Sequence, residues 1–204
     1  MTTKPCVTAA VILAAGGSRR LGQPKQLLPM EGSPLLAHTH RAVLATPNVS
    51  ASFVVLGANA DRIQAAIDLN PSELVINPRW TEGLASSLQS GLQAALKWRP
   101  DLDAVLFTLA DQPYLSFVAL EKLVALGQAS ADPTRLVTSF YDGHPGAPCW
   151  AHASLFPQIM ELRGDQGLKP LFNLLPPAQI KRVHLPELAT DIDTIDDYQK
   201  VLNR

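Results

Sequence analysis

A glycine-rich run from Leu13 to Leu28, LAAGGSRRLGQPKQLL, holds the residue types best suited to chemistry in this chain. Its glycines can adopt backbone angles that other residues avoid, so the loop can wrap closely around a ligand. Its backbone amides can face an anion, and Arg20 and Lys25 add two cations on what we expect to be an exposed loop. The run matches neither a Walker loop nor GxGxxG. It predicts a loop that holds a phosphate chain, against the alternative of a glycine-rich surface turn with solvated cations.

A carboxylate follows the most apolar of the predicted strands. Asp111 comes just after Ala104–Leu109, and a carboxylate at the mouth of a buried strand is costly to desolvate without a cation. A hard divalent ion is the natural partner near a triphosphate, so we expect Asp111 to bind a metal. The alternative role, an N-cap for a helix that begins near Ser116, is weaker because Ser116 can cap that helix itself.

Asp191 and Asp193 stand just before the last predicted helix, Ile195–Leu202. Alternation along an extended segment places both carboxylates on one side, so they could face the same ion. In the competing interpretation, Asp193 or Thr194 caps the helix, and the acidic residues favour its dipole.

These residues must be positioned by elements that alternate between strand-like and helix-like patterns. Such alternation is typical of a mostly parallel sheet covered on both faces. We therefore expect one α/β domain over residues 1–204, a Rossmann-like three-layer fold. The predicted strands are Val7–Leu13, Ser52–Leu56, Glu73–Ile76, Ala104–Leu109, Arg135–Phe140 and Ile180–Leu185. The predicted helices are Pro34–Ala45, Asn59–Asp68, Leu84–Lys97, Ser116–Ala129, Ala153–Leu162, Gly167–Leu175 and Ile195–Leu202.

The segment Tyr141–Cys149 contains two glycines and two prolines, and is predicted to be irregular. Ligands of open α/β sheets bind beyond the carboxyl ends of the strands. The glycine-rich loop, Asn77–Gly83, Asp111 and Gly143–Pro148 all follow such ends, so we expect them to gather at one edge of the sheet.

Composition narrows the class of protein. The 204 residues are 47% apolar and 17% charged, with a net charge of −1, which is typical of a globular protein and argues against a nucleic-acid surface. No run approaches the length of a membrane span, and Cys6 and Cys149 are interpreted as reduced thiols of a cytoplasmic protein. His38 and His40 do not share a helix face, so they are interpreted as ordinary surface or partly buried residues.

The glycine-rich run also resembles LAAGxSxRxGxxK, the signature of the MobA-like nucleotidyltransferases. Its AAG and the Gln23 before Pro24-Lys25 are similar to the molybdenum cofactor cytidylyltransferase branch. LADQP at 109–113 resembles the segment of the family's metal aspartate, and the ending from Asp191 resembles D-x-D-T-x-x-D. NPRWTEGLASS at 77–87 resembles NxxWxxGxxxS, and GHPGAP at 143–148 resembles GxPxxP. GDQG at 164–167 resembles GDxGA[RK], although Leu168 replaces the usual small residue and Lys169 stands at the basic position.

The resemblance implies a role for each matching residue. Arg20 and Lys25 would be catalytic, and Asp111 and Asp193 would bind Mg²⁺. The implied nucleotide-binding residues are Leu13, Ala14, Ala15, Gly16, Gly17, Ser18, Gly22 and Ser86. The implied substrate-binding residues are Asn77, Trp80, Gly83, His144, Pro145, Gly146 and Asp165. Two alternatives stay open: the segment from Asn77 could be a plain capped helix with Trp80 packed on the core, and His144 could be a solvated loop residue.

The resemblance further implies transfer of CMP from CTP to the terminal phosphate of molybdopterin, with release of pyrophosphate and a molybdenum hydroxylase of the xanthine dehydrogenase type as client. Cytosine is small, and a pocket formed by Leu13–Gly17 could fit it and crowd a purine. The alternatives are a guanylyltransferase, a sugar- or polyol-phosphate nucleotidyltransferase, a non-enzymatic chaperone that delivers the cofactor, and an oxidoreductase, which no dinucleotide fingerprint supports.

Overall fold

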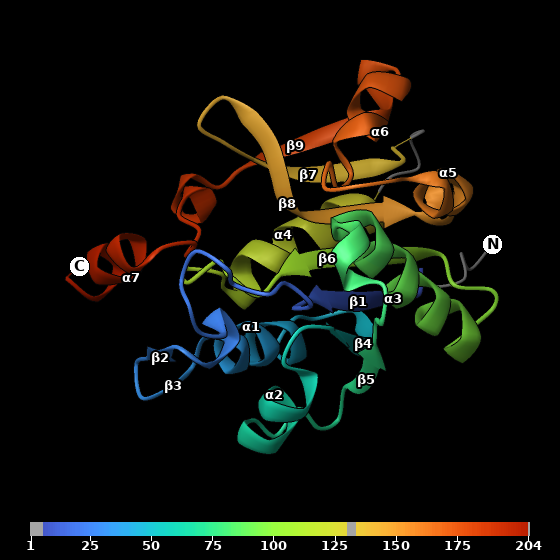
Figure 1. Cartoon of the computed structure of the whole chain (residues 1–204). Helices are drawn as coiled ribbons and strands as arrows, with labels where there is room; N and C mark the ends of the chain where they lie inside the picture. Colours follow the sequence, from blue (N-terminus) through green and yellow to red (C-terminus); the bar gives the residue numbers. More distant parts are fainter. Residues whose placement is uncertain (1–5, 130–133, 204) are drawn as a thin grey trace.

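A seven-stranded sheet in the order β5-β4-β1-β6-β8-β7-β9 organises the computed structural model, which describes residues 6–129 and 134–203. Figure 1 shows the strands in this order, with β9 uppermost and β5 lowest. β1 pairs in parallel with β4 and β6, and β4 with β5. β8 is antiparallel to both β6 and β7, while β7 and β9 are parallel. The strands are β1 Thr8–Leu13, β4 Val49–Leu56, β5 Glu73–Ile76, β6 Ala104–Leu109, β7 Leu136–Tyr141, β8 His144–His152 and β9 Ile180–His184.

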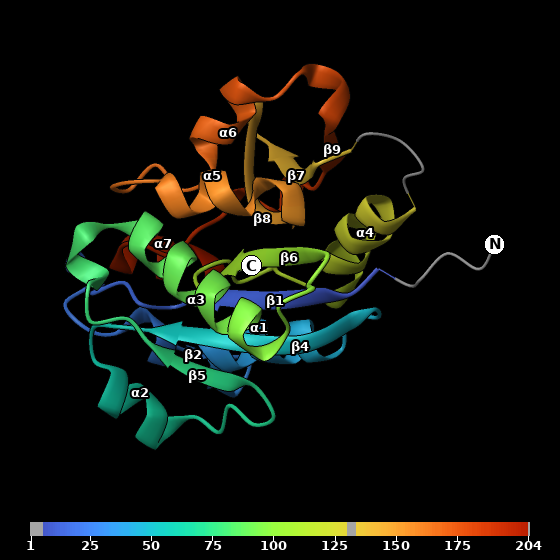
Figure 2. The same cartoon turned by 90° about the vertical axis from the view of Figure 1, so that its right-hand side faces the viewer.

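Helices cover both faces of this sheet, because its central strands are apolar on both sides. All six residues of β1 are buried, and alternate residues enter two different cores. One core packs against α3 (Leu84–Trp98), α5 (Phe156–Glu161) and α6 (Lys169–Leu174). The other packs against α1 (Leu35–Leu44), α2 (Ala60–Ala66) and α4 (Phe117–Gln128), and α7 (Ile195–Leu202) closes the chain. Figures 1 and 2 show this layered arrangement, which confirms the predicted three-layer α/β fold.

Short elements connect these layers. They are the hairpin strands β2 (Pro29–Met30) and β3 (Ser33–Pro34), and the 3₁₀ turns η1 (Lys25–Leu27), η2 (Trp80–Glu82), η3 (Ala153–Leu155), η4 (Pro177–Gln179) and η5 (Pro186–Ala189). Within the described residues, the structure has no helix that is both long and apolar enough to span a membrane.

The prediction that Tyr141–Cys149 is irregular was wrong. Its second half belongs to β8, which forms a hairpin with β7. Asp142 and Gly143 supply the turn, since both have positive φ, at 50° and 77°. The register shifts because Thr138 pairs with Cys149 and Ser139 with Gly146, which leaves Ala147 and Pro148 outside the ladder. Proline has no N–H to donate, so a bulge is where a strand tolerates it.

Candidate active site

The loop after β1 is held by the turn that follows it. The backbone N–H of Lys25 donates to Ser18 Oγ at 3.0 Å. The neighbouring Gln26 is almost fully buried and donates from its side chain to the carbonyl oxygens of Ala14 and Gly16. The sequence reasoning missed Gln26, although a polar residue beside the apolar Leu27 and Leu28 is a sign of a buried, hydrogen-bonded group.

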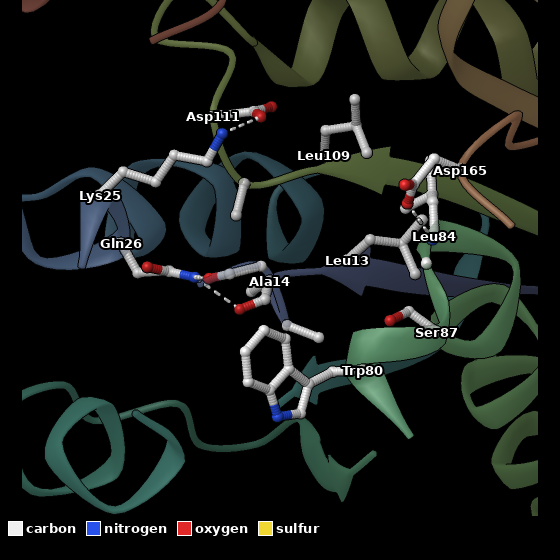
Figure 3. Close-up of a pocket in the computed structure, with 14 residues that line it drawn as sticks. Leu13, Ala14, Lys25, Gln26, Trp80, Leu84, Ser87, Leu109, Asp111 and Asp165 are labelled. Atoms are coloured by element: carbon white, nitrogen blue, oxygen red, sulfur yellow. Dashed lines mark hydrogen bonds and ion pairs between the residues drawn. The ribbon is translucent and has the colours of Figure 1, made fainter. Parts of the chain in front are cut away.

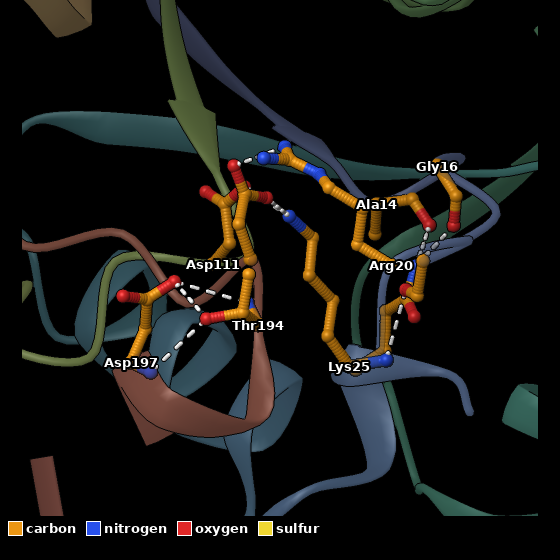
Figure 4. Close-up of polar contacts among 10 residues, drawn as sticks. Ala14, Gly16, Arg20, Lys25, Asp111, Thr194 and Asp197 are labelled. Carbon is orange, nitrogen blue, oxygen red and sulfur yellow. Dashed lines mark hydrogen bonds and ion pairs between the residues drawn. The ribbon is translucent and has the colours of Figure 1, made fainter. Parts of the chain in front are cut away.

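Lys25 forms the centre of a charge cluster built from three distant parts of the chain. Its Nζ lies 2.6 Å from Asp111 Oδ2 and 3.0 Å from Asp193 Oδ1. Arg20 Nη2 lies 2.6 Å from Asp193 Oδ2. Figure 4 shows Lys25 reaching toward Asp111 at the end of its strand. The predicted cations and the predicted metal ligands therefore lie together.

Burial and charge act in opposite directions on this cluster. The Lys25 side chain is only 16% exposed, so its expected place on an exposed loop was wrong. Burial lowers the pKa of Lys25, but the carboxylates of Asp111 and Asp193 outweigh it, and the pKa lies above its ordinary value. For Asp193, burial raises the pKa, but Lys25 and Arg20 outweigh that effect and lower it. Both shifts favour the charged form, that of the Lys25 ammonium and that of the Asp193 carboxylate.

Asp191 stands apart from the paired carboxylates. Asp191 as a whole residue is exposed, but its carboxyl group is partly buried. This burial and the charges of Asp111 and Asp193 raise the pKa of Asp191 to about 7, although Lys25 acts in the opposite direction. Asp191 therefore changes charge near neutral pH.

Thr194 settles which residue caps the last helix. Thr194 Oγ1 accepts from the backbone N–H of Asp197, and Asp197 Oδ2 accepts from the backbone N–H of Thr194. This capping box leaves the Asp193 side chain free for Lys25 and Arg20. Ser116 likewise caps α4 through a bond from the backbone N–H of Ala119, so Asp111 is not needed there.

Asp111 keeps one oxygen that could bind a divalent ion. Asp111 Oδ2 binds Lys25, whereas its Oδ1 is buried and has no hydrogen-bond partner in the described residues. No three acidic, histidine or cysteine side chains in that part of the chain could hold a metal together. Mg²⁺ is commonly held by one or two carboxylates plus substrate phosphates. The donor set of Asp111 and Asp193 fits that kind of site.

Two neighbouring cavities open beside the cluster. The first, of about 200 Å³, lies against the glycine-rich loop, with Lys25 and Asp111 on one side and Trp80 on the other (Figure 3). The second, of about 380 Å³, lies toward the β7–β8 hairpin and Asp191. The residues common to both cavities are Leu13, Leu84, Leu109 and Asp165. Two ligands bound side by side would thus meet next to the charge cluster.

The predicted ligand-binding residues divide between these cavities and the surrounding frame. Those that line the first cavity are Leu13, Ala14, Ala15, Gly16, Lys25, Trp80, Gly83, Asp111 and Asp165. Those that line the second are Leu13, His144, Pro145, Gly146 and Asp165. Those that line neither are Gly17, Ser18, Arg20, Gly22, Asn77, Ser86 and Asp193.

The start of α3 differs from the prediction that Ser86 binds the nucleotide. The backbone N–H of Leu84 donates to Asp165 Oδ1 at 3.0 Å, and that of Ala85 to the carbonyl oxygen of Gly164 at 2.9 Å. Ser86 is buried and its hydroxyl donates to backbone carbonyls. The loop carrying Asp165 thus caps the helix and occupies the amides of Leu84 and Ala85.

Asn77 supports the first turn of α3 through hydrogen bonds. It has no exposed surface, and its side-chain amide donates to Ser86 Oγ and to Ser87 Oγ. Ser87, which follows the expected nucleotide contact Ser86 in the sequence, lines the first cavity. Its oxygen accepts from Asn77, so its own proton is available for a ligand. The family pattern in which the serine follows glycine at the fourth position points to Ser87 as well.

Gln112 also escaped the sequence reasoning. It is buried, and its side-chain amide donates to the carbonyl oxygens of Ala147 and Leu188, each at 3.1 Å. It therefore ties the end of β6 to the β8 bulge and to the turn before Asp191.

One of the two helix histidines and both cysteines can also be placed in the structure. His40 is buried and contacts Ser72 Oγ at 2.8 Å, so it is not a surface residue. Cys6 and Cys149 are free thiols.

Comparison with known proteins adds an independent line of evidence. Residues 10–183 match the sequence model of the MobA-like NTP transferase domain. The chain is 31% identical to nicotine blue oxidoreductase of Paenarthrobacter nicotinovorans, covering 98% of each, and 30% identical to purine catabolism protein PucB of Bacillus subtilis, covering 94% of each. It is 30% identical to molybdenum cofactor guanylyltransferase of Rhodobacter capsulatus, over 72% of this chain and 70% of that one.

Solved structures also superpose on nearly the whole of this chain. Rv0371c of Mycobacterium tuberculosis superposes with a TM-score of 0.83 at 27% identity, covering 98% of this chain and all of the other. Its complex with manganese gives a TM-score of 0.77 at 26% identity, covering 96% of this chain and 98% of the other.

Proposed function

Because the chain belongs to the MobA-like NTP transferase family and is a nucleotidyltransferase, we propose that it transfers CMP from CTP to the terminal phosphate of molybdopterin. The observation that carries the proposal is the Lys25–Asp111–Asp193 cluster beside two adjoining cavities. The first cavity would take the nucleotide and the second the pterin, whose modified product would serve a molybdenum hydroxylase of the xanthine dehydrogenase type.

In this reaction, a phosphate oxygen of the acceptor attacks the α-phosphorus of the nucleotide. A new P–O bond forms there, the bond to the β-phosphate oxygen breaks, and pyrophosphate leaves with the electron pair. The attacking oxygen is already anionic at neutral pH, so no side chain has to remove a proton from it. The task of the protein is positioning and charge neutralisation, as in phosphoryl transfer generally.

Lys25 and Arg20 supply the neutralisation in this proposal. Without nucleotide they balance Asp111 and Asp193. Phosphates entering the first cavity would take over part of their charge, and Lys25 would bind the negative charge that grows on the leaving pyrophosphate. Asp111 and Asp193 would hold Mg²⁺, which when bound would supply further neutralisation of the phosphate charge. The manganese complex of Rv0371c supports the use of a divalent ion.

The second cavity supports a flat, polar acceptor. Tyr141, His144 and Phe172 contribute ring surfaces, while Lys169 offers a cation to a phosphate group. His144 is exposed at the start of β8, and it lines the second cavity.

The test is a direct assay of the purified protein with Mg²⁺. Each of the four nucleoside triphosphates is supplied with and without molybdopterin, and pyrophosphate release and the mass of the product are measured. The proposal expects a CMP adduct only when CTP and molybdopterin are both present. Pyrophosphate release with a sugar or polyol phosphate, and none with molybdopterin, would reassign the acceptor.

Two further arms test the other candidates. A GMP adduct would place the protein with the guanylyltransferase of Rhodobacter capsulatus. Oxidation or reduction of nicotine blue, and no nucleotidyl transfer, would favour an oxidoreductase such as the relative from Paenarthrobacter nicotinovorans. Tight binding of finished cofactor by a protein that releases no pyrophosphate would favour a delivery chaperone.

A further inference from the structure

Gln26 lies against the glycine-rich loop at the wall of the first cavity, and the residue is 1% exposed. Its Nε2 donates to the carbonyl oxygen of Ala14 at 2.7 Å and to that of Gly16 at 3.1 Å. Figure 4 shows both bonds converging from the two labelled carbonyls. The carbonyl oxygen between them, on Ala15, accepts from the backbone N–H of Ala58 at 3.0 Å. Three successive carbonyl groups are thus tied to donors of the protein.

Three backbone amides of the same stretch, unlike its carbonyl groups, lack hydrogen-bond partners in the described residues. Those of Ala15, Gly16 and Gly17 make no hydrogen bond to any residue in the two described ranges. Consecutive amides without a protein acceptor form an anion-binding surface when their carbonyls are turned away. The loop has this polarity because each carbonyl is held elsewhere.

The side-chain amide of Gln26 suits this role better than other groups would. Two carbonyls face it, so its NH₂ group must point at the loop, and its Oε1 is left without a partner in the described part of the chain. A carboxylate at this position would repel both carbonyls, and an apolar side chain would leave them unsatisfied. Gln26 also follows Lys25 in η1, so one short turn carries both the cation and the side chain that holds the loop carbonyls.

We infer that Gln26 is a positioning residue, which holds the loop amides of Ala15 to Gly17 in the conformation that receives the phosphates of the nucleotide. The inference rests on the proposed nucleotidyl transfer. Gln26 acts through the loop backbone, whereas Lys25 acts on the phosphates themselves. Its loss should therefore weaken nucleotide binding and leave the acceptor cavity unchanged.

The first experiment compares Gln26→Leu with wild type. Because two buried carbonyls lose their donor, we expect nucleotide to bind at least about tenfold more weakly and its KM to rise by a similar factor. The KM of the acceptor should stay unchanged. The matched control is Gln128→Leu, since Gln128 also donates to backbone carbonyls, those of Cys6 and Asn48, but beside the other end of β1. This control should keep the KM of wild type for the nucleotide.

The second experiment uses Gln26→Glu and separates positioning from a loss of packing. An ionised Glu repels the two carbonyls, whereas a protonated Glu donates one hydrogen bond. The ratio of variant to wild-type kcat/KM for the nucleotide should therefore rise severalfold as pH falls from about 8.5 to about 6. The corresponding ratio for Gln26→Leu should stay flat. Dividing by wild type at each pH removes the titration of groups that both proteins share.

The outcomes separate this inference from the proposed function. Wild type that uses no nucleoside triphosphate overturns the proposed function and, with it, the role of Gln26. Wild type that uses CTP, alongside a folded Gln26→Leu that binds CTP equally well, overturns the inference alone. If Gln26→Leu does not fold, the pH ratio of Gln26→Glu decides: a flat ratio overturns the inference, and a rising ratio supports it.

Discussion

Lys25 Nζ lies 2.6 Å from Asp111 Oδ2, although the two residues are 86 positions apart in the chain. One follows β1 through the glycine-rich loop, and the other follows β6, the parallel neighbour of β1. Parallel neighbours end at the same edge of the sheet, so the two side chains meet there. The ion pair keeps both charges in a largely buried place where neither is tolerated alone.

Loss of this cation should damage both catalysis and stability. We expect Lys25→Ala to lower kcat by about a hundredfold or more, because preorganised charge at the pyrophosphate is missing. It should also lower the thermal stability, since Asp111 loses the partner of its Oδ2. Arg20→Ala should lower kcat with little change in stability, because the Arg20 side chain is 69% exposed. Steady-state kinetics and thermal unfolding of both variants measure this difference, and unimpaired transfer by the double variant would sink the phosphate-loop assignment.

The metal assignment predicts a specific effect of Asp111→Asn. The amide keeps the shape of the side chain but removes the anionic oxygen that has no partner in the described residues. We expect magnesium to bind more weakly and transfer to be nearly abolished, while Asp193→Asn has a similar or milder effect. Titration with Mn²⁺, followed by its paramagnetic relaxation signal, gives the affinity of each variant. Equal affinity in wild type and Asp111→Asn would mean that another residue holds the ion.

Nucleotide choice should favour CTP over GTP by at least about tenfold in kcat/KM, or roughly 1.4 kcal/mol. The first cavity is small, at about 200 Å³, and is bounded by the loop backbone and Trp80, so a purine is expected to be crowded. Competition between labelled CTP and GTP, with molybdopterin and Mg²⁺ present, measures the ratio in one vessel. Predominant GMP incorporation would move the protein to the guanylyl branch and leave the rest of the mechanism standing.

Asp191 predicts a pH dependence of stability. Its pKa of about 7 in the folded protein lies above its ordinary value, so the folded state holds a proton that the unfolded state releases. Stability therefore falls as pH rises from the unfolded pKa toward about 7, and changes no further from this group above that. Asp191→Asn should remove this slope and raise the melting temperature relative to wild type at alkaline pH.

Thermal unfolding from acid to alkaline pH tests this prediction. Asp142→Asn is the control, because Asp142 sits in the hairpin turn, where its φ of 50° also suits asparagine. The two variants are compared with wild type at each pH. A melting-temperature difference for Asp191→Asn that does not grow with pH would contradict the assigned shift.

Local sequence patterns specify the layered fold and the outline of the site. Apolar runs separated by amphipathic helices specify a sheet buried on both faces, and the glycine-rich loop and Asp111 follow two of its strands. Strand ends at the same edge must lie close together, so local patterns were enough to predict that these residues meet. The β7–β8 hairpin escaped prediction because its glycines and prolines are typical of a loop, and only the bulge at Ala147 and Pro148 reconciles them with a strand.

The roles of these residues depend on contacts between remote segments, which local patterns do not reveal. Lys25 is buried rather than exposed because two carboxylates from remote segments neutralise it. Asp165, expected to bind substrate, accepts a hydrogen bond from the backbone N–H of Leu84 at the start of α3. The side-chain amides of Gln26 and Asn77 donate to backbone and hydroxyl oxygens. The fold brings these oxygens to them, so no local pattern reveals the pairing. Local sequence sets the elements, but charge compensation and hydrogen-bond satisfaction depend on which elements come together in space.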